Sequence, residues 1–418
     1  MKVYKFGGAS VKNASGIRNL AKILSGENEN LVVVISALGK TTNALEKFLK
    51  AWLSGETNNI ILLEELFQNH LTVVRELFSD AASVTYKLEE TLTDIKEFLS
   101  TERNGMYDFM YDQVVSFGEI WSTIIVAEYL KECSFDIQWI DIRKNLITDH
   151  TYRDANILWK ESEERVQSAF DFSVKKIYLT QGFIGGTLDG KTTTLGREGS
   201  DYTAALIANM LDAEQVTVWK DVPGILNADP DWLTDAVKLD EISYKEAVEM
   251  TFSGAKVIHP KTIKPLHNKN IPMHVRSFID PDEIGTIIKA GATLKRIIPF
   301  FIRKEEQILI SILPNDFSFV MGENLSMIFQ IFKHHGIKVN LVEASAVSLD
   351  VCIDDERPRI EKLLKDLQPE FSSVYNDNVE MITVRHYNLK ALERITYGRE
   401  ILLEQRTRST ARYVVRKL

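Results

Sequence analysis

The chain has 418 residues, of which 44% are hydrophobic and 26% are charged, and its formal net charge at pH 7 is −9. This length supports two or three domains, and an acidic balance without a large basic cluster argues against nucleic acid as a main partner. The two cysteines show no metal-ligand spacing, and no apolar run approaches the roughly 18 residues of a membrane span. We therefore expect a cytoplasmic protein with no membrane partner.

Residues 1–296 alternate short β-rich runs with helical stretches, which is typical of an α/β domain with a largely parallel sheet. Near-continuous apolar character in the strands predicts that both faces of this sheet are covered. Apolar residues at three- and four-residue spacing between Thr57 and Glu132 predict a helical lobe over the sheet. The clearest strands are expected at Leu31–Leu38, Phe135–Ile140, Lys176–Ile184, Val216–Trp219 and Met273–Phe278.

Residues 305–388 follow a different rhythm, that of a compact βαββαβ unit with a ferredoxin-like α+β arrangement. Its helices are expected at Asn324–His335 and Arg357–Leu367, and its last strand near Val379–Val384. Residues 389–418 are basic and show no second strand-helix-strand set, so we expect them to form a tail. The sequence thus predicts a large α/β domain followed by a smaller α+β domain.

The N-terminal motif Lys5-Phe6-Gly7-Gly8-Ala9-Ser10 places a cation and two glycines where an apolar strand leads into a helix. A helix from Ser10 to Leu24, with Ser10 as its N-cap, would direct free backbone amides toward the anion that Lys5 reaches. Ser36 and Thr42 follow the next apolar strand. They can line the same site or cap the following helix.

A second anion site is predicted at Thr192–Ala205, where β-branched residues lead into a glycine turn and then a helix start. Arg197 offers a bidentate fork for a carboxylate, and Asp201 offers the opposite charge. This pair suits a zwitterionic ligand. Two such anion sites in one chain suggest phosphoryl transfer.

The run from Gly185 to Thr192 satisfies the spacing of a Walker A motif. A P-loop requires a helix to begin at the lysine, but Thr192-Thr193-Thr194 is β-branched and Gly196 follows. We therefore interpret this segment as a hairpin and not as a nucleotide-binding loop.

Three further charged residues are candidates for the site, and two of them admit two interpretations. Glu119 interrupts an apolar helix, where it is either a surface charge or a group that recognises an ammonium ion. Asp221 follows a strand and precedes a turn, so it is either an Asx cap or the wall of a nucleotide pocket. Lys256 lies near a glycine and a proline turn and is a second candidate cation for a triphosphate.

Taken together, these segments resemble the aspartate kinases of the amino acid kinase family, and they occur in that family's order. The resemblance implies an amino acid kinase-like αβα sandwich with an ACT-type regulatory region after it. It also implies ATP-dependent phosphorylation of the side-chain carboxylate of L-aspartate to 4-phospho-L-aspartate, the entry to lysine, threonine and methionine synthesis. The likeness rests on Lys5–Ser10, Phe117–Glu119, Thr180–Gly185, Thr192–Ala205, Trp219–Gly224 and Gly254–Pro260.

The resemblance assigns roles residue by residue. Lys5 and Lys256 look like the cations on the transferring phosphoryl group, and Arg197 and Asp201 complete the catalytic set. Arg197 would grip the α-carboxylate, while Glu119 and Asp201 receive the ammonium group. The aspartate site would comprise Ser36, Thr42, Glu119, Arg197 and Asp201, and the nucleotide site Lys5, Gly7, Gly8, Lys220, Asp221, Leu226, Lys256 and Val257. Mg²⁺ is expected to be bound through phosphate oxygens and water, without a named protein ligand.

The regulatory half leads to three further expectations. An amino-acid effector is expected at the ACT-type region, but Ala344-Ser345-Ala346 departs from the run seen in lysine-inhibited relatives. Residues 389–418 are interpreted as the remnant of a second ACT unit. A ferredoxin-like sheet with an open edge favours pairing, so we expect a homodimer or a higher homo-oligomer.

Two rival functions stay open at this point. The chain could be another amino acid kinase, of the glutamate or acetylglutamate type. It could also be an amino-acid-sensing paralogue that has lost catalysis. The presence of Lys5, Arg197, Asp201 and Lys256 argues against the second alternative.

Overall fold

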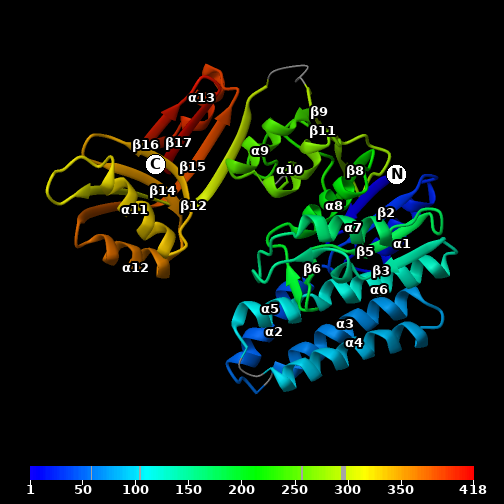
Figure 1. Ribbon diagram of the computed structural model, residues 1–418. Coiled ribbons are helices and arrows are strands. Elements are labelled where there is room, and N and C mark those ends of the chain that lie inside the picture. The colour runs from blue at the N-terminus through cyan, green and yellow to red at the C-terminus, as the bar shows by residue number, and fades with distance from the viewer. Residues whose placement is uncertain (58, 103–104, 256–257, 293–297) are drawn as a thin grey trace. The chain divides into compact units, whose positions relative to one another are not determined.

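The computed structural model describes residues 1–57, 59–102, 105–255, 258–292 and 298–418 (Figure 1). The chain divides into two compact units. The first comprises Met1–Ile225, Lys238–Val248 and Val257–Thr293, and the second comprises Leu226–Val237, Glu249–Lys256 and Leu294–Leu418. Among the described residues, no helix combines the length and the apolar character needed to cross a bilayer.

The first unit is built on an eight-stranded sheet with the order β3-β5-β2-β1-β8-β10-β11-β9. Every neighbouring pair is parallel except β10 and β11, which confirms the largely parallel sheet expected from the apolar runs. The strands are β1 (Lys2–Phe6), β2 (Leu31–Ile35), β3 (Ile137–Ile140), β5 (Ile177–Gln181), β8 (Gln215–Lys220), β9 (Glu241–Ser243), β10 (Met273–Ser277) and β11 (Thr286–Lys289).

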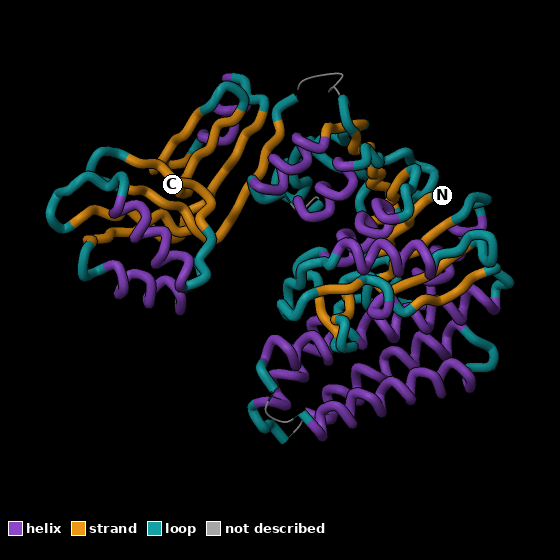
Figure 2. Tube along the Cα trace, in the orientation of Figure 1, coloured by secondary structure: helices purple, strands orange, loops and turns teal. Residues whose placement is uncertain are grey.

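Helices cover both faces of this sheet (Figures 1 and 2). One face packs against α6, over which α3 and α4 form a further helical layer, and α8 packs against β1, β2 and β8. Because strand side chains alternate, Tyr4 and Phe6 of β1 join the large apolar core while Lys5 points toward α8. The helices are α1 (Ala14–Ser25), α2 (Thr41–Leu53), α3 (Asn59–Leu77), α4 (Ala82–Thr101), α5 (Tyr107–Val115), α6 (Phe117–Glu132), η1 (Ile142–Lys144), α7 (Trp159–Ala169), α8 (Gly199–Met210), α9 (Tyr244–Phe252) and α10 (Pro260–Asn268).

A small three-stranded sheet lies beside the main one and contains β4 (Ile147–Thr148), β6 (Ile184–Thr187) and β7 (Thr192–Thr194). β6 and β7 pair antiparallel, which confirms the hairpin interpretation of the Walker-like run. The expectation of one strand over Lys176–Ile184 is wrong. Phe183 has a left-handed φ of 70°, so the chain leaves the main sheet after β5 and enters the small sheet at β6.

The start of α1 also differs from expectation. The helix begins at Ala14, and the side chain of Asn13 accepts a hydrogen bond from the amide of Gly16 at 3.0 Å. Ser10 is not the N-cap, because its amide donates to the carbonyl of Gly7 in a preceding turn. The amides nearest the glycines are therefore those of a turn and not those of a helix end.

The second unit has a six-stranded sheet with the order β13-β14-β12-β15-β17-β16. The order β13-β14-β12-β15 is that of a ferredoxin-like βαββαβ unit, as expected, and Ile308, Ile310 and Ile312 pack beneath α11 and α12. The elements are β12 (Phe300–Pro314), α11 (Glu323–His334), β13 (Val339–Ala344), β14 (Leu349–Asp354), α12 (Arg357–Leu367), β15 (Phe371–Arg385), α13 (Leu389–Thr396), β16 (Arg399–Arg406) and β17 (Thr410–Lys417).

Residues 389–418 do not form a tail but a helix followed by two strands. They form α13, β16 and β17, and β17 pairs with the last six residues of β15. In β17, Tyr413 and Val415 face an apolar cluster while Arg412 and Arg416 are only partly buried. The basic residues thus lie on ordered strands, and Val414 packs in a second apolar cluster.

Candidate active site

The first unit contains a cavity of about 560 Å³ at the carboxyl ends of its parallel strands. Residues that follow β1 and β2, the end of β8 and the start of α8 together line this cavity. Carboxyl ends of parallel strands are where α/β proteins commonly bind ligands. Of the residues assigned from the sequence, the cavity brings together Lys5, Gly7, Gly8, Ser36, Thr42, Glu119, Arg197, Asp201, Lys220 and Asp221.

The two N-terminal glycines form a close-packed corner of the cavity. A Cβ atom on Gly8 would lie 2.6 Å from the carbonyl oxygen of Ala37 and 2.8 Å from that of Gly39, so a side chain does not fit. The amide of Gly39 also donates to the carbonyl of Gly8 at 3.0 Å. The backbone after β1 is therefore held against the loop after β2, with its surface open to a ligand.

Asp201, in the first turn of α8, is surrounded by two lysines. Its Oδ1 lies 2.6 Å from Nζ of Lys5, and its Oδ2 lies 3.9 Å from Nζ of Lys220. Burial disfavours ionisation of Asp201, but the charges of Lys5 and Lys220 outweigh burial and hold its pKa below the usual value. The group is thus an ionised, buried carboxylate that orients both cations at the cavity floor.

Glu119, on α6, is the opposite case. Its side chain is only 2% exposed, which excludes the surface-charge interpretation. Thr42 Oγ1 donates to Glu119 Oε1 at 3.5 Å, and Oε2 has no hydrogen-bond partner among the described residues. Burial raises the pKa of Glu119 to about 8. A buried carboxylate with no cation beside it marks a position for a positively charged ligand group.

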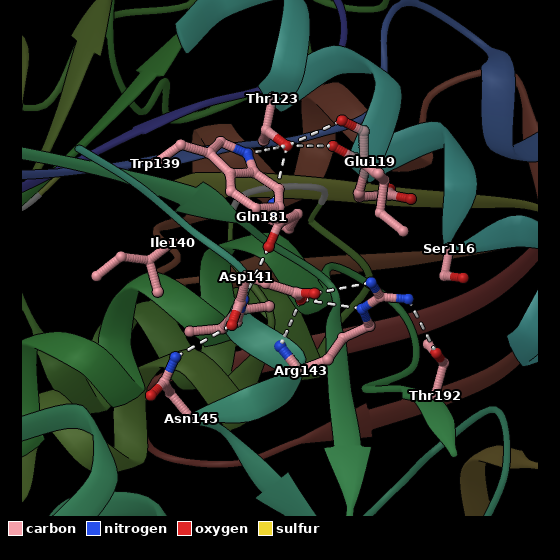
Figure 3. Close-up of polar contacts among 12 residues, drawn as sticks. Ser116, Glu119, Thr123, Trp139, Ile140, Asp141, Arg143, Asn145, Gln181 and Thr192 are labelled. Carbon is pink, nitrogen blue, oxygen red and sulfur yellow. Dashed lines mark hydrogen bonds and ion pairs between the residues drawn. The ribbon is translucent and has the colours of Figure 1, made fainter. Parts of the chain in front are cut away.

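A buried network fixes the part of α6 that carries Glu119 (Figure 3). Thr123 Oγ1 donates to the carbonyl of Glu119 at 2.8 Å and accepts hydrogen bonds from Trp139 Nε1 and Gln181 Nε2, at 3.0 and 2.9 Å. In the preceding position, Ser122 Oγ donates to the carbonyl of Ser36 at 2.8 Å. These bonds attach α6 to β3, β5 and the end of β2, so the position of Glu119 is set by the sheet.

The mouth of the cavity carries the guanidinium of Arg197, which is exposed and forms no ion pair with any residue that the structure describes. The neighbouring Glu198 adopts a left-handed φ of 55° and accepts a hydrogen bond from the amide of His259 at 2.8 Å. This bond ties the Arg197 loop to the start of α10. Arg197 is therefore a cation on an anchored loop, available to an anionic group.

Several cavity-lining residues were given no role from the sequence, among them Tyr111, Arg153 and Phe183. The guanidinium of Arg153 lies 4.4 Å from the ring centroid of Tyr111. Arg153 is in the loop between the two-residue strand β4 and α7, without a glycine beside it, so no local signal marks it. A positive φ at Phe183 was equally invisible in the sequence.

The other assigned residues lie elsewhere. Lys256 and Val257 fall outside the described residues, so their assignment stays a prediction. Leu226 is the first residue of the second unit and does not line the cavity. Within the described part of the chain, no cluster of three or more histidine, cysteine, aspartate or glutamate side chains is arranged to hold a metal ion.

Comparison with known proteins decides the family. The model of the amino acid kinase family matches residues 1–277. The chain belongs to this family. The resemblance to aspartate kinases that the motifs suggested is also confirmed, since relatives of about 30% identity are aspartokinases.

Lysine-sensitive aspartokinase 3 of Escherichia coli is 32% identical to this amino acid kinase over 353 residues, which cover 84% of the chain and 78% of the relative. Bifunctional aspartokinase/homoserine dehydrogenase 2 of Arabidopsis thaliana is 31% identical over 382 residues, 88% of this chain but 42% of that protein. The chain thus spans less than half the length of such bifunctional relatives. The crystal structure of E. coli aspartokinase III in complex with aspartate and ADP superposes with a TM-score of 0.86 at 27% identity, covering 100% of this chain and 96% of that one.

Proposed function

We propose that this chain is an aspartate kinase, which transfers the γ-phosphoryl group of ATP to the side-chain carboxylate of L-aspartate. The observation that carries the proposal is that one cavity holds a lysine pair around Asp201, a buried Glu119 that forms no ion pair with any described residue, and the guanidinium of Arg197. These are complementary to a polyphosphate, an ammonium group and a carboxylate. The relative solved with aspartate and ADP supports the same pair of ligands.

In the proposed reaction, a side-chain oxygen of aspartate attacks the γ-phosphorus, and the bond to the bridging oxygen of ADP breaks. The attacking carboxylate is already ionised at neutral pH, so the site needs no general base. Catalysis then depends on alignment and on neutralising the charge of the transferred group. Lys5 and Lys220 supply positive charge at the cavity floor, and the amides around Gly7 and Gly8 are placed for backbone contacts.

The amino acid would be held by its two charged ends. Arg197 would bind the α-carboxylate through its planar fork. Glu119 would receive the ammonium group, because Asp201 is already engaged by Lys5 at 2.6 Å. Asp201 would therefore orient the two lysines, and it would not bind the ammonium group as the resemblance had implied. Asp221 and Ser36 would complete the walls on the nucleotide side and the aspartate side, respectively.

Mg²⁺ fits this site only together with the nucleotide. The described residues offer no cage of three carboxylates, and Mg²⁺ favours phosphate oxygens and water. When bound with ATP, the ion would supply further charge neutralisation at the phosphates. The protein's own part is to place Lys5 and Lys220 beside them.

The experiment that tests the function is an acceptor comparison with ATP and L-aspartate, L-glutamate or N-acetylglutamate. Hydroxylamine traps an acyl phosphate as its hydroxamate, so product is read directly for each acid. We expect hydroxamate with aspartate alone. Product with glutamate and not with aspartate would replace this proposal by the glutamate kinase alternative, and aspartate binding without turnover would favour the sensing paralogue.

We also propose that the second unit binds an amino-acid effector and that the chain forms a homodimer or a higher homo-oligomer. The ferredoxin-like sheet supports both proposals, and a structure of E. coli aspartokinase III in complex with lysine and aspartate matches with a TM-score of 0.83. Inhibition assays with lysine, threonine and methionine, singly and in pairs, test the first proposal. Light scattering that finds a strict monomer would contradict the second.

A further inference from the structure

The edge strand β7 leads into the loop that carries Arg197, and side chains of α5 hold its open side. β7 pairs with β6 on one side only. On the other side, the amide of Thr192 donates to Gln113 Oε1 at 3.1 Å, and Gln113 Nε2 donates to the carbonyl of Thr192 at 2.7 Å. The amide of Thr194 donates to Asp112 Oδ2 at 2.8 Å. Two adjacent residues of α5 thus substitute for a neighbouring strand.

Asp112 does more than complete this edge. It is fully buried, and it forms no ion pair within the described residues. Its Oδ1 accepts from the hydroxyl of Thr194 at 2.7 Å, and its Oδ2 also accepts from the amide of Arg153 at 3.0 Å. Both Thr194 and Arg153 line the cavity. A single carboxylate therefore joins two cavity-lining segments that lie 41 and 82 residues away in sequence.

The backbone at Arg153 needs such a restraint. Its φ is 69°, in the left-handed region that a residue with a side chain seldom occupies. The amide held by Asp112 fixes this turn, and the carbonyl of Thr194 accepts from the amide of Ala155 at 2.9 Å. The guanidinium of Arg153 lies over the ring of Tyr111 and 3.4 Å from Oδ1 of the exposed Asp108, and both Arg153 and Tyr111 line the cavity.

The side chains of β7 also make hydrogen bonds that restrain the strand. Arg143, which is paired with Asp141, donates to Thr192 Oγ1 at 3.4 Å, a contact drawn as a dashed line in Figure 3. Thr148 and Thr193 share a hydrogen bond between their hydroxyls at 2.6 Å. These contacts anchor the strand itself at Thr192 and Thr193, while Asp112 anchors its end, where the cavity begins.

We propose that Asp112 is a positioning residue for the amino-acid end of the cavity. It holds Thr194, and through it the Arg197 loop, and it holds the turn that presents Arg153 as a second cation for the bound amino acid. The inference rests on the proposed function, because it assigns this end of the cavity to the acceptor. Neither Asp112 nor Arg153 touches the phosphates in this scheme.

The test compares Asp112→Ala, Asp112→Asn and Gln113→Ala. Alanine removes all three acceptor contacts, so the KM for the amino acid should rise roughly 10- to 100-fold, with the KM for ATP nearly unchanged. Asparagine can accept both amides through its oxygen and donate to the Thr194 hydroxyl, so it should restore most of the loss. Gln113→Ala is the matched control, because it loosens β7 at Thr192, which does not line the cavity.

An Asp112→Ala variant whose KM values match wild type would overturn the inference, as would equal effects of Asp112→Ala and Gln113→Ala. Should the alanine variant fail to fold, Arg153→Ala decides, because it removes the presented cation without touching Asp112. A raised KM for the amino acid supports the proposal, and an unchanged KM rejects it. The wild-type enzyme is assayed with aspartate, glutamate and N-acetylglutamate. If it phosphorylates an acid other than aspartate, the proposed function is wrong. The role of Asp112 is then tested by the KM for that acid.

Discussion

Asp201 and Glu119 are both buried carboxylates of one cavity, but the chain treats them in opposite ways. Asp201 meets Lys5 and Lys220, and its pKa is held low. Among the described side chains, Glu119 has Thr42 as its hydrogen-bond partner and no cation, and burial raises its pKa to about 8. Burying an isolated charge costs free energy. The charge of Asp201 is neutralised by lysines of the protein, whereas the charge of Glu119 would be neutralised by a cationic group of the ligand. The contrast separates the machinery that orients cations from the group that selects the substrate.

The largest loss of activity should come from removing Lys5, the cation that pairs with Asp201. Lys5→Ala takes away the charge 2.6 Å from Asp201, so we expect turnover to fall by roughly 10²-fold or more. The measurement is kcat at saturating ATP and aspartate. Lys22→Ala, an exposed lysine of α1, is the matched control and should leave kcat unchanged. Normal turnover in the Lys5 variant would show that Lys5 does not contribute to phosphoryl transfer.

Removing the charge of Glu119 should weaken the binding of aspartate. Glu119→Gln keeps the size of the side chain but removes its charge, so the KM for aspartate should rise by about 10-fold or more, as expected for losing a charged hydrogen bond. Steady-state assays with aspartate varied at fixed ATP give the value. Glu132→Gln, exposed at the end of the same helix, should behave as wild type. A larger loss of kcat than of binding would contradict the division of roles between Asp201 and Glu119.

The raised pKa of Glu119 also predicts a pH dependence of stability. Between its ordinary value of 4.5 and about 8, the folded chain keeps a proton that the unfolded chain has released. The stabilisation from this group is therefore greatest below pH 4.5 and is lost as the pH rises toward 8. Thermal unfolding without ligands, measured from pH 5 to pH 8, should show a smaller decline for Glu119→Gln than for wild type. Parallel curves would mean that Glu119 is already ionised at neutral pH.

The smallest effect is expected from the network behind Glu119. Thr123→Val keeps the shape of the side chain but leaves Trp139 Nε1 and Gln181 Nε2 without their acceptor. We expect a loss of about 1–3 kcal/mol in the free energy of unfolding. Urea titration measures this loss, and the KM for aspartate should rise only a few-fold. Unchanged stability would show that the sheet does not need this link to fix α6.

Local patterns predicted much of this molecule. The apolar runs indicated a parallel sheet, and the helix expected at Arg357–Leu367 has these same bounds in the structure. The glycine turn expected before α8 is also present, and Gly196 and Gly199 line the cavity. Errors arose where one residue redirected the chain, as Phe183 does, or where basic residues flanked a short buried run, as in residues 410–417.

The candidate site divides in the same way. Lys5, Arg197 and Asp201 were found because glycines and strand ends lie beside them in the sequence. Asp112 and Arg153 gave no such signal, because their environment comes from segments that meet only after folding. A buried aspartate on a short helix looks like any other polar residue until its donors are known.

The sequence by itself indicated most of the elements, the glycine turns beside the cavity and the resemblance to a family, because these depend on neighbouring residues and on the order of motifs. Only the tertiary structure decided which carboxylates are paired. Asp201 and Glu119 are both acidic residues near a helix start, and nothing local distinguishes them. Their difference comes from packing, since β1 brings Lys5 to one of them and α6 buries the other among apolar neighbours and hydroxyl groups.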